Sequence, residues 1–155
     1  MKLYLARHGD ALSSENDPLQ PLSQRGIHET ESVARLLQPF NLELDEIVHS
    51  TKLRAKQTAE ILGKTLAPEL TLIQLEGLKP NDPIDPILEE ISTFDRVVLI
   101  VGHLPFMEKL LTKLLTGQEG ISPVELSASC VICLEQIDRV WKISWMVSPR
   151  ILGNL

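Results

Sequence analysis

Two histidines and two arginines in this sequence have the types and positions needed for chemistry on a phosphoryl group. Arg7 and His8 follow the first apolar run of the chain. Arg54 closely follows the second, and His103 follows a later run rich in β-branched residues. An arginine presents a planar fork of donors that fits a phosphoryl group, and a neutral imidazole can attack phosphorus directly. This combination predicts phosphoryl transfer with His8 as the nucleophile.

The predicted roles of these four side chains follow from their charge. Arg7 and Arg54 would hold the phosphoryl oxygens. Their positive charge would also lower the pKa of His8, which keeps its ring neutral and nucleophilic near pH 7. His103 would donate to a phosphoryl oxygen, because catalysis of phosphoryl transfer is mostly positioning and electrostatics. The scheme needs no metal ion and no cofactor.

A carboxyl group is needed if the leaving group must be protonated. Glu76 is the predicted general acid, and Asp10 and Asp17 are the alternatives. An imidazole leaving group would make a strong acid dispensable. A metal-site interpretation would instead use four possible ligands: His8, Asp10, Glu76 and His103. Two arginines beside the site would repel a cation and argue against this interpretation.

The spacing of apolar residues predicts the elements that must position these side chains. Four apolar runs predict strands at residues 2–6, 46–49, 70–75 and 96–101. Four segments with helical spacing predict helices, at residues 23–38 with Ser23 as the cap, and at 52–66, 84–93 and 105–116. The last two runs, residues 128–136 and 140–147, predict an antiparallel strand pair.

Strands that alternate with helices predict an α/β fold. We expect a three-layer sandwich with a central, largely parallel sheet and an antiparallel C-terminal strand pair. Ligands of such sheets bind beyond the carboxyl ends of the strands. The five candidate residues all follow strands, so the prediction gathers them at one edge: Arg7, His8, Arg54, Glu76 and His103. The length of 155 residues and the lack of an internal linker predict one domain over residues 1–155.

The composition limits the class of partner and the compartment. A formal net charge of -6 argues against nucleic acid or an anionic membrane as partner. No apolar run approaches the length of a membrane span, and the first apolar stretch is too short for a signal peptide, so we expect a cytoplasmic protein. Cys130 and Cys133 lie in an apolar run without a second cysteine pair, which predicts buried structural thiols. His28 and His49 are predicted to be structural or surface residues.

Four ordered motifs resemble those of the histidine phosphatase, or phosphoglycerate mutase-like, superfamily. They are Arg-His-Gly at residues 7–9, Leu-Ser-x-x-Gly at 22–26, Ser-x-x-x-Arg-Ala-x-x-Thr-Ala at 50–59, and the second-histidine element at 101–103. Arg-His-Gly alone is a weak signal, but four ordered motifs at strand-to-helix junctions are specific. The resemblance spans nearly the whole chain and implies the phosphoglycerate mutase-like fold.

The resemblance implies a phosphohistidine intermediate on His8, with phosphate held by Arg7, Arg54 and His103. It is closest to bacterial phosphohistidine phosphatases of the SixA type, which act on phosphohistidine in signalling proteins. The mutase branch differs, because it carries an asparagine where this chain has Ser14 and has long insertions over the site. The predicted substrate is therefore a phosphohistidine-containing signalling protein. A phosphatase of small phosphoesters and a phosphoryl-binding module without turnover are the alternatives.

Overall fold

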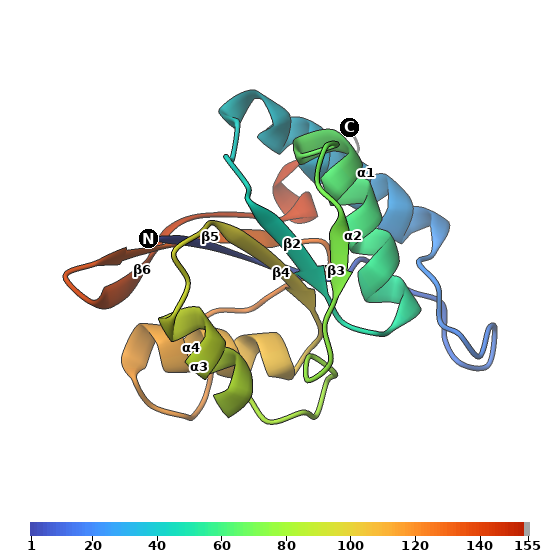
Figure 1. Cartoon of the computed structure of the whole chain (residues 1–155). Coiled ribbons are helices and arrows are strands. Elements are labelled where there is room, and N and C mark those ends of the chain that lie inside the picture. The colour runs from blue at the N-terminus through green and yellow to red at the C-terminus, as the bar shows by residue number, and fades with distance from the viewer. Residues whose placement is uncertain (154–155) are drawn as a thin grey trace.

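The computed structural model describes residues 1–153, which form one mixed sheet of six strands flanked by helices (Figure 1). The strands are β1 (Lys2–Arg7), β2 (Glu46–His49), β3 (Leu72–Gln74), β4 (Val98–Gly102), β5 (Val131–Ile137) and β6 (Val140–Val147). Their order across the sheet is β3-β2-β4-β1-β5-β6. The first four strands are parallel, whereas β5 runs antiparallel to β1, and β6 antiparallel to β5. The predicted sheet with its antiparallel C-terminal pair is confirmed.

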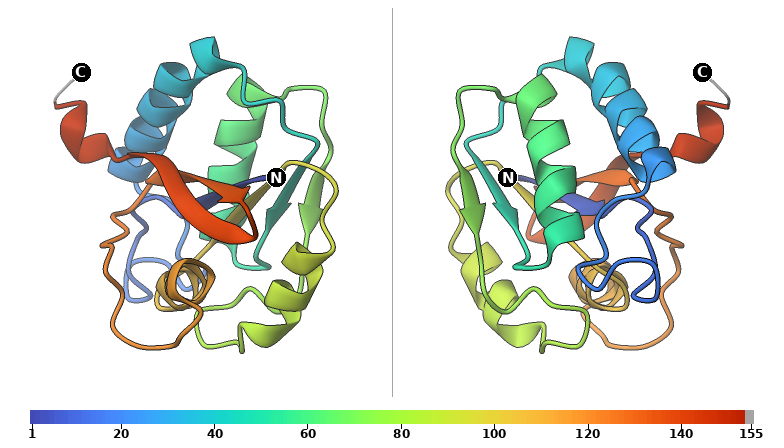
Figure 2. Two further views of the ribbon diagram at one scale, coloured as in Figure 1. Left: turned by 90° about the vertical axis from the view of Figure 1, so that its left-hand side faces the viewer. Right: turned by 90° about the vertical axis from the view of Figure 1, so that its right-hand side faces the viewer.

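Helices cover both faces of this sheet. The longer ones are α1 (Gln24–Leu37), α2 (Leu53–Leu66), α3 (Asp85–Ser92) and α4 (Phe106–Thr116), and two short 3-10 helices are η1 (Gln38–Phe40) and η2 (Pro149–Ile151). α1 and α2 lie on one face, and α3 and α4 lie on the other (Figures 1 and 2). The three-layer sandwich is as predicted. Within the described residues, no helix is long and apolar enough to cross a membrane.

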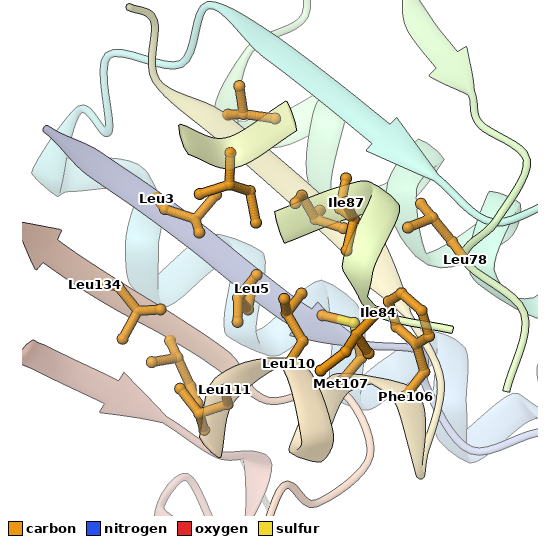
Figure 3. Close-up of a cluster of buried hydrophobic side chains, with 14 of the residues drawn as sticks. Leu3, Leu5, Leu78, Ile84, Ile87, Phe106, Met107, Leu110, Leu111 and Leu134 are labelled. Atoms are coloured by element: carbon orange, nitrogen blue, oxygen red, sulfur yellow. The ribbon is translucent and has the colours of Figure 1, made fainter. Parts of the chain in front are cut away.

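The side chains of β1 hold the two helical layers to the sheet. Leu3 and Leu5 belong to the core under α3 and α4, which also contains Leu110 (Figure 3). Tyr4 and Ala6 belong to the core under α1 and α2, because successive side chains of a strand point to opposite faces. All residues of β4 are buried in the same way. Each large apolar side chain buried here contributes about 1.5–3 kcal/mol, and burial on both faces explains the continuous apolar runs.

Three strands are shorter than predicted, and β4 begins at Val98 rather than at residue 96. β3 covers only part of the predicted range 70–75, because it lies at the edge of the sheet and pairs only with the short strand β2. β5 begins at Val131 rather than at residue 128. The reason is a turn at Ser129, whose φ is 61° and whose N–H donates to the carbonyl of His8 at 3.2 Å. This turn carries the chain past the carboxyl end of β1.

Candidate active site

The two candidate histidines lie side by side because their strands are neighbours. β1 and β4 are paired in parallel, with Arg7 opposite Gly102, so the next residues of both strands leave the sheet together. The N–H of His8 donates to the carbonyl of Gly102 at 3.0 Å. The ring centroids of His8 and His103 are 5.0 Å apart, and the two rings are tilted by 54°. The structure therefore brings these two predicted residues together at one edge.

Hydrogen bonds fix which nitrogen of His8 is free to react. Its Nδ1 lies 2.6 Å from the carbonyl oxygen of Gly9. A carbonyl oxygen only accepts, so Nδ1 must carry the proton in the neutral ring, and the lone pair is left on Nε2. The N–H of Gly9 donates to Oγ1 of Thr58 at 3.0 Å, and that hydroxyl donates to the carbonyl of Arg54 at 2.8 Å. The loop of residues 9–13, which follows His8 and which we call the nucleophile loop, is thus held to the first turns of α2.

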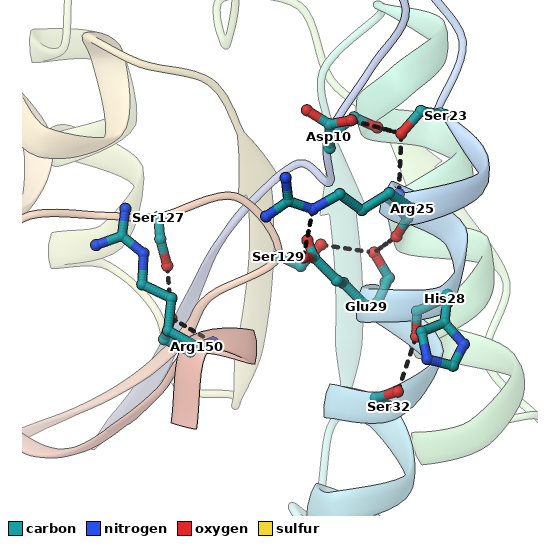
Figure 4. Close-up of polar contacts among 12 residues, drawn as sticks. Asp10, Ser23, Arg25, His28, Glu29, Ser32, Ser127, Ser129 and Arg150 are labelled. Atoms are coloured by element: carbon teal, nitrogen blue, oxygen red, sulfur yellow. Dashed lines mark hydrogen bonds and ion pairs between the residues drawn. The ribbon is translucent and has the colours of Figure 1, made fainter. Parts of the chain in front are cut away.

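The N-terminal end of α1 packs directly against the nucleophile loop (Figure 4). The hydroxyl of Ser23 donates to Oδ2 of Asp10 at 2.5 Å and accepts from the N–H of Gly26 at 3.0 Å. A Cβ atom at Gly26 would collide with the backbone carbonyl of Asp10. A Cβ atom at Gly9 would lie 2.9 Å from Oγ1 of Thr30. These two glycines let the helix approach closely enough to support the loop.

Both candidate arginines line the same pocket as His8. This pocket has a volume of about 310 Å³, and residues 9–13 form much of its wall. Arg7 is held by a hydrogen bond from its Nη1 to the carbonyl of Leu126 at 2.7 Å. Arg54 comes from the first turn of α2 and is partly buried, which lowers the pKa of its guanidinium. Two cations beside one imidazole make this pocket suitable for a phosphate-sized anion.

Both imidazoles are held neutral. The pKa of His8 is lowered to about 4, first by burial and then by Arg54 and Arg7, against the bond to Gly9 and the charge of Asp10. The pKa of His103 is lowered to about 3, again mainly by burial, with His8 and Arg54 adding to the effect. The direction for His8 agrees with the sequence prediction. The main cause is burial rather than the cations, whose positions in the fold could not be judged from sequence.

His103 is a buried partner of His8 rather than a wall of the pocket. The residue is 1% exposed, and its Nε2 lies 2.7 Å from Oγ of Ser50. Its Nδ1 is buried and has no hydrogen-bond partner among residues 1–153. Ser50 was not predicted from the sequence to be part of the site. The available signal was its position directly after β2, at the same edge of the sheet as the two histidines.

Of the three candidate acids, only Asp10 lines the pocket. Glu76 is 77% exposed in its side chain, lies 3.9 Å from Nζ of Lys79, and is not part of the pocket wall. Asp17 accepts from the N–H of Leu19 at 2.9 Å in the loop before α1. Asp10 does line the pocket. The role of Glu76 as acid stays a prediction. Across residues 1–153, no three His, Cys, Asp or Glu side chains group closely enough to hold a metal ion.

The other histidines and the two cysteines have structural positions. His28 is exposed on α1. His49 is buried, and its Nδ1 lies 2.8 Å from the carbonyl of Ser50. Cys130 and Cys133 are buried free thiols, as the sequence predicted. Burial raises the pKa of Cys130 to about 11, which makes it unreactive as a thiolate.

Comparisons with known proteins cover almost the whole chain. Residues 3–82 match the Histidine phosphatase superfamily (branch 1). An uncharacterised protein of Picosynechococcus sp. (strain ATCC 27264 / PCC 7002 / PR-6) is 34% identical over 77% of this chain and 76% of that protein. Phosphohistidine phosphatase SixA of Escherichia coli (strain K12) is 26% identical over 96% of this chain and 94% of SixA. A structure of the protein histidine phosphatase SixA complexed with tungstate is similar with a TM-score of 0.84 and 27% identity, covering 99% of this chain and 100% of that chain.

Proposed function

The chain belongs to the histidine phosphatase superfamily, and on this premise we propose that it is a phosphohistidine phosphatase that acts on a phosphorylated protein. The observation that carries the proposal is the pair of neutral imidazoles, His8 and His103, 5.0 Å apart beside a pocket walled by two arginines. Similarity to SixA over 96% of the chain supports the same class of substrate. The whole chain would act as a single domain.

His8 is the nucleophile in this proposal. Its Nε2 attacks phosphorus, and the bond between phosphorus and the substrate imidazole breaks as the new P–N bond forms. The departing imidazole nitrogen takes up a proton. Water then attacks the phosphohistidine and gives up a proton to solvent, the bond to His8 breaks, and inorganic phosphate leaves. The hydrogen bond from Nδ1 to Gly9 holds the ring in the required tautomer throughout.

The cations supply both binding and activation. Arg7 and Arg54 attract the phosphoryl oxygens, and the same charges help to keep His8 unprotonated. If the hydroxyl of Ser50 donates to Nε2 of His103, the proton of that ring lies on Nδ1, which has no partner within residues 1–153. We propose that His103, whose ring lies beside that of His8, donates to a phosphoryl oxygen during the transfer. It would stabilise the charge that is in transfer.

The weak position of the candidate acids favours phosphohistidine as substrate. Glu76 is exposed, lies 3.9 Å from Nζ of Lys79 and is not part of the pocket wall, so it is poorly placed to reach a leaving group. We keep Glu76 as the proposed acid and Asp10, which lines the pocket, as its rival. An imidazole leaves more readily than an alkoxide and makes the smallest demand on either group. The alkoxide that leaves from an alkyl phosphoester would need a better-placed acid to protonate it.

The proposed substrate is a side chain presented by a signalling protein in the cytoplasm. The pocket is bounded by the surface loop of residues 9–13 and by Gln20 rather than by a covering domain, which leaves room for another protein to approach. Cys130 and Cys133 are both free thiols, which fits a reducing compartment.

The test is phosphate release by the purified protein. We expect release from a histidine-phosphorylated protein to be faster than release from sugar phosphates, to be inhibited by vanadate and to persist with a chelator. His8→Ala should abolish it, while His28→Ala, an exposed histidine on α1, serves as the matched control. Turnover in His8→Ala would remove the nucleophile assignment. Faster turnover of sugar phosphates would favour the small-phosphoester alternative, and binding without release would favour the binding module.

A further inference from the structure

A second pocket adjoins the catalytic one. It has a volume of about 230 Å³, and it shares two wall residues, Arg7 and Ala128, with the catalytic pocket. Its other charged wall residues are Arg25 and Glu29 from α1, and Glu125 and Arg150 from the C-terminal part of the chain. We call this pocket the arginine cleft. Because Arg7 lies in both walls, a ligand in the cleft would lie beside a phosphoryl group at His8.

One wall of the arginine cleft is Arg25, in the first turn of α1 (Figure 4). Its Nε lies 2.8 Å from Oε1 of Glu29, one helical turn away, and its side chain is 76% exposed. A guanidinium has five N–H donors, and this contact uses the Nε donor. Within residues 1–153 neither Nη atom forms a hydrogen bond. Glu29 therefore orients the group while its terminal donors face outward.

The opposite wall is Arg150, in η2. Its Nη2 lies 3.4 Å from Oε1 of Glu125, and its side chain is 70% exposed. The backbone that carries it is fixed, because Pro149 is buried and the hydroxyls of Ser148 and Ser127 are 2.7 Å apart. Figure 4 shows Arg150 on η2 and Arg25 on α1, two segments far apart in the sequence. The two guanidinium groups are thus held by separate elements at one pocket.

The local charge of this region is opposite in sign to that of the whole chain. The formal net charge is -6, yet three arginines line the cleft against two glutamates. A carboxylate fits the terminal donors of a guanidinium with two parallel hydrogen bonds. A lysine or arginine of a partner would instead have to compete with the existing pairs. The three arginines exceed the two glutamates by one positive charge, which favours an anion over a cation.

We propose that the arginine cleft binds an acidic side chain of the substrate protein, an Asp or Glu close to the phosphohistidine. The inference rests on the proposed function and adds a specificity determinant to it. Arg25 and Arg150 would hold the carboxylate while the phosphoryl group occupies the neighbouring pocket. The interaction is exposed, so it would change kcat/KM by about two- to tenfold rather than by orders of magnitude.

The test uses pairs of synthetic phosphohistidine peptides. Each pair carries one Glu, or Gln in its place, at one of the positions within three residues of the phosphohistidine. We expect the wild-type protein to prefer the Glu peptide of at least one pair by about two- to tenfold in kcat/KM, and the preference to shrink as salt is added. In the double variant Arg25→Gln, Arg150→Gln the Glu-to-Gln ratio should fall to about one. Arg35→Gln, an exposed arginine on α1 outside the cleft, should keep the wild-type ratio.

The outcomes separate the two proposals. Wild-type turnover of the Gln peptides measures phosphohistidine hydrolysis alone, and its absence would overturn the proposed function. Equal turnover of Glu and Gln peptides in every pair would overturn the arginine cleft and leave the proposed function standing. A preference that survives in the double variant would also overturn it, because some other group would then recognise the carboxylate.

Discussion

Acid should destabilise this protein through its two buried imidazoles. Burial and nearby cations lower the pKa of His103 to about 3 and that of His8 to about 4, from an ordinary value of 6.5. The native state therefore excludes protons that the unfolded chain takes up as the pH falls below 6.5. Where the unfolded state binds more protons than the native state, the free energy of unfolding decreases as the pH is lowered. The two histidines therefore cost no stability well above pH 6.5, and the loss of stability grows as the pH falls from 6.5 to the native pKa values.

The size of the effect follows from these values. Between pH 6.5 and pH 5 an unfolded histidine becomes almost fully protonated, while His103 in the native state stays neutral. A difference of 1.5 pH units at about 1.36 kcal/mol per unit gives a loss of about 2 kcal/mol for His103. His8 is partly exposed, so solvent screening makes its share smaller.

Urea unfolding at pH 7 and pH 5 measures this loss. The wild-type protein should lose about 2 kcal/mol more of its free energy of unfolding between the two pH values than His103→Asn does. Wild type and His103→Asn contain the same carboxylates, so the difference between their losses of unfolding free energy comes from the imidazole of His103. His28→Gln, an exposed replacement on α1, should follow the wild type. An identical pH dependence in wild type and His103→Asn would refute the reasoning, because the fold would then not be what keeps that ring neutral.

Three further outcomes are expected. Ser50→Ala removes one hydrogen bond to His103, which should lower kcat by about two- to tenfold with little change in KM; an unchanged kcat would show that Ser50 does not position the ring. Gly26→Ala places a Cβ against the carbonyl of Asp10, so the melting temperature should drop by several degrees, and a drop no larger than that of Gln24→Ala would contradict the close packing of α1. Tungstate or vanadate should raise the stability by about 2.7 kcal/mol at a hundred times its dissociation constant; a thermal shift that is the same in Arg54→Gln would mean that the anion binds elsewhere.

The sequence predicted the fold well because local signals mark nearly every junction. Ser23 caps α1 as expected, and the apolar run before His103 is the buried strand β4. The turn at Ser129 was hidden, because residues 128–134 form a mostly apolar run without glycine or proline. Ser129 is held there by the carbonyl of His8 at the end of β1 and by the hydroxyl of Thr30 on α1, both far away in sequence.

The position of Glu76 shows what a single sequence does not contain. Glu76 follows β3 as predicted, but β3 is the edge strand, and β2 separates it from β4. A side chain after the edge strand starts farther from His8 than one after a neighbouring strand. Ser50 follows β2, next to β4, and therefore reaches His103. The spatial order of strands depends on long-range pairing, which spacing along one chain does not reveal.

The contacts that organise the nucleophile also determine when activity appears during synthesis. Arg7 and His8 leave the ribosome early, but the carbonyl of Leu126 that holds Arg7 and the N–H of Ser129 that holds the backbone of His8 come more than a hundred residues later. Chains grow from the N-terminus at about 5–20 residues per second. A nascent chain therefore carries its reactive imidazole for several seconds without a finished site, and phosphatase activity begins only when the C-terminal strand pair has emerged.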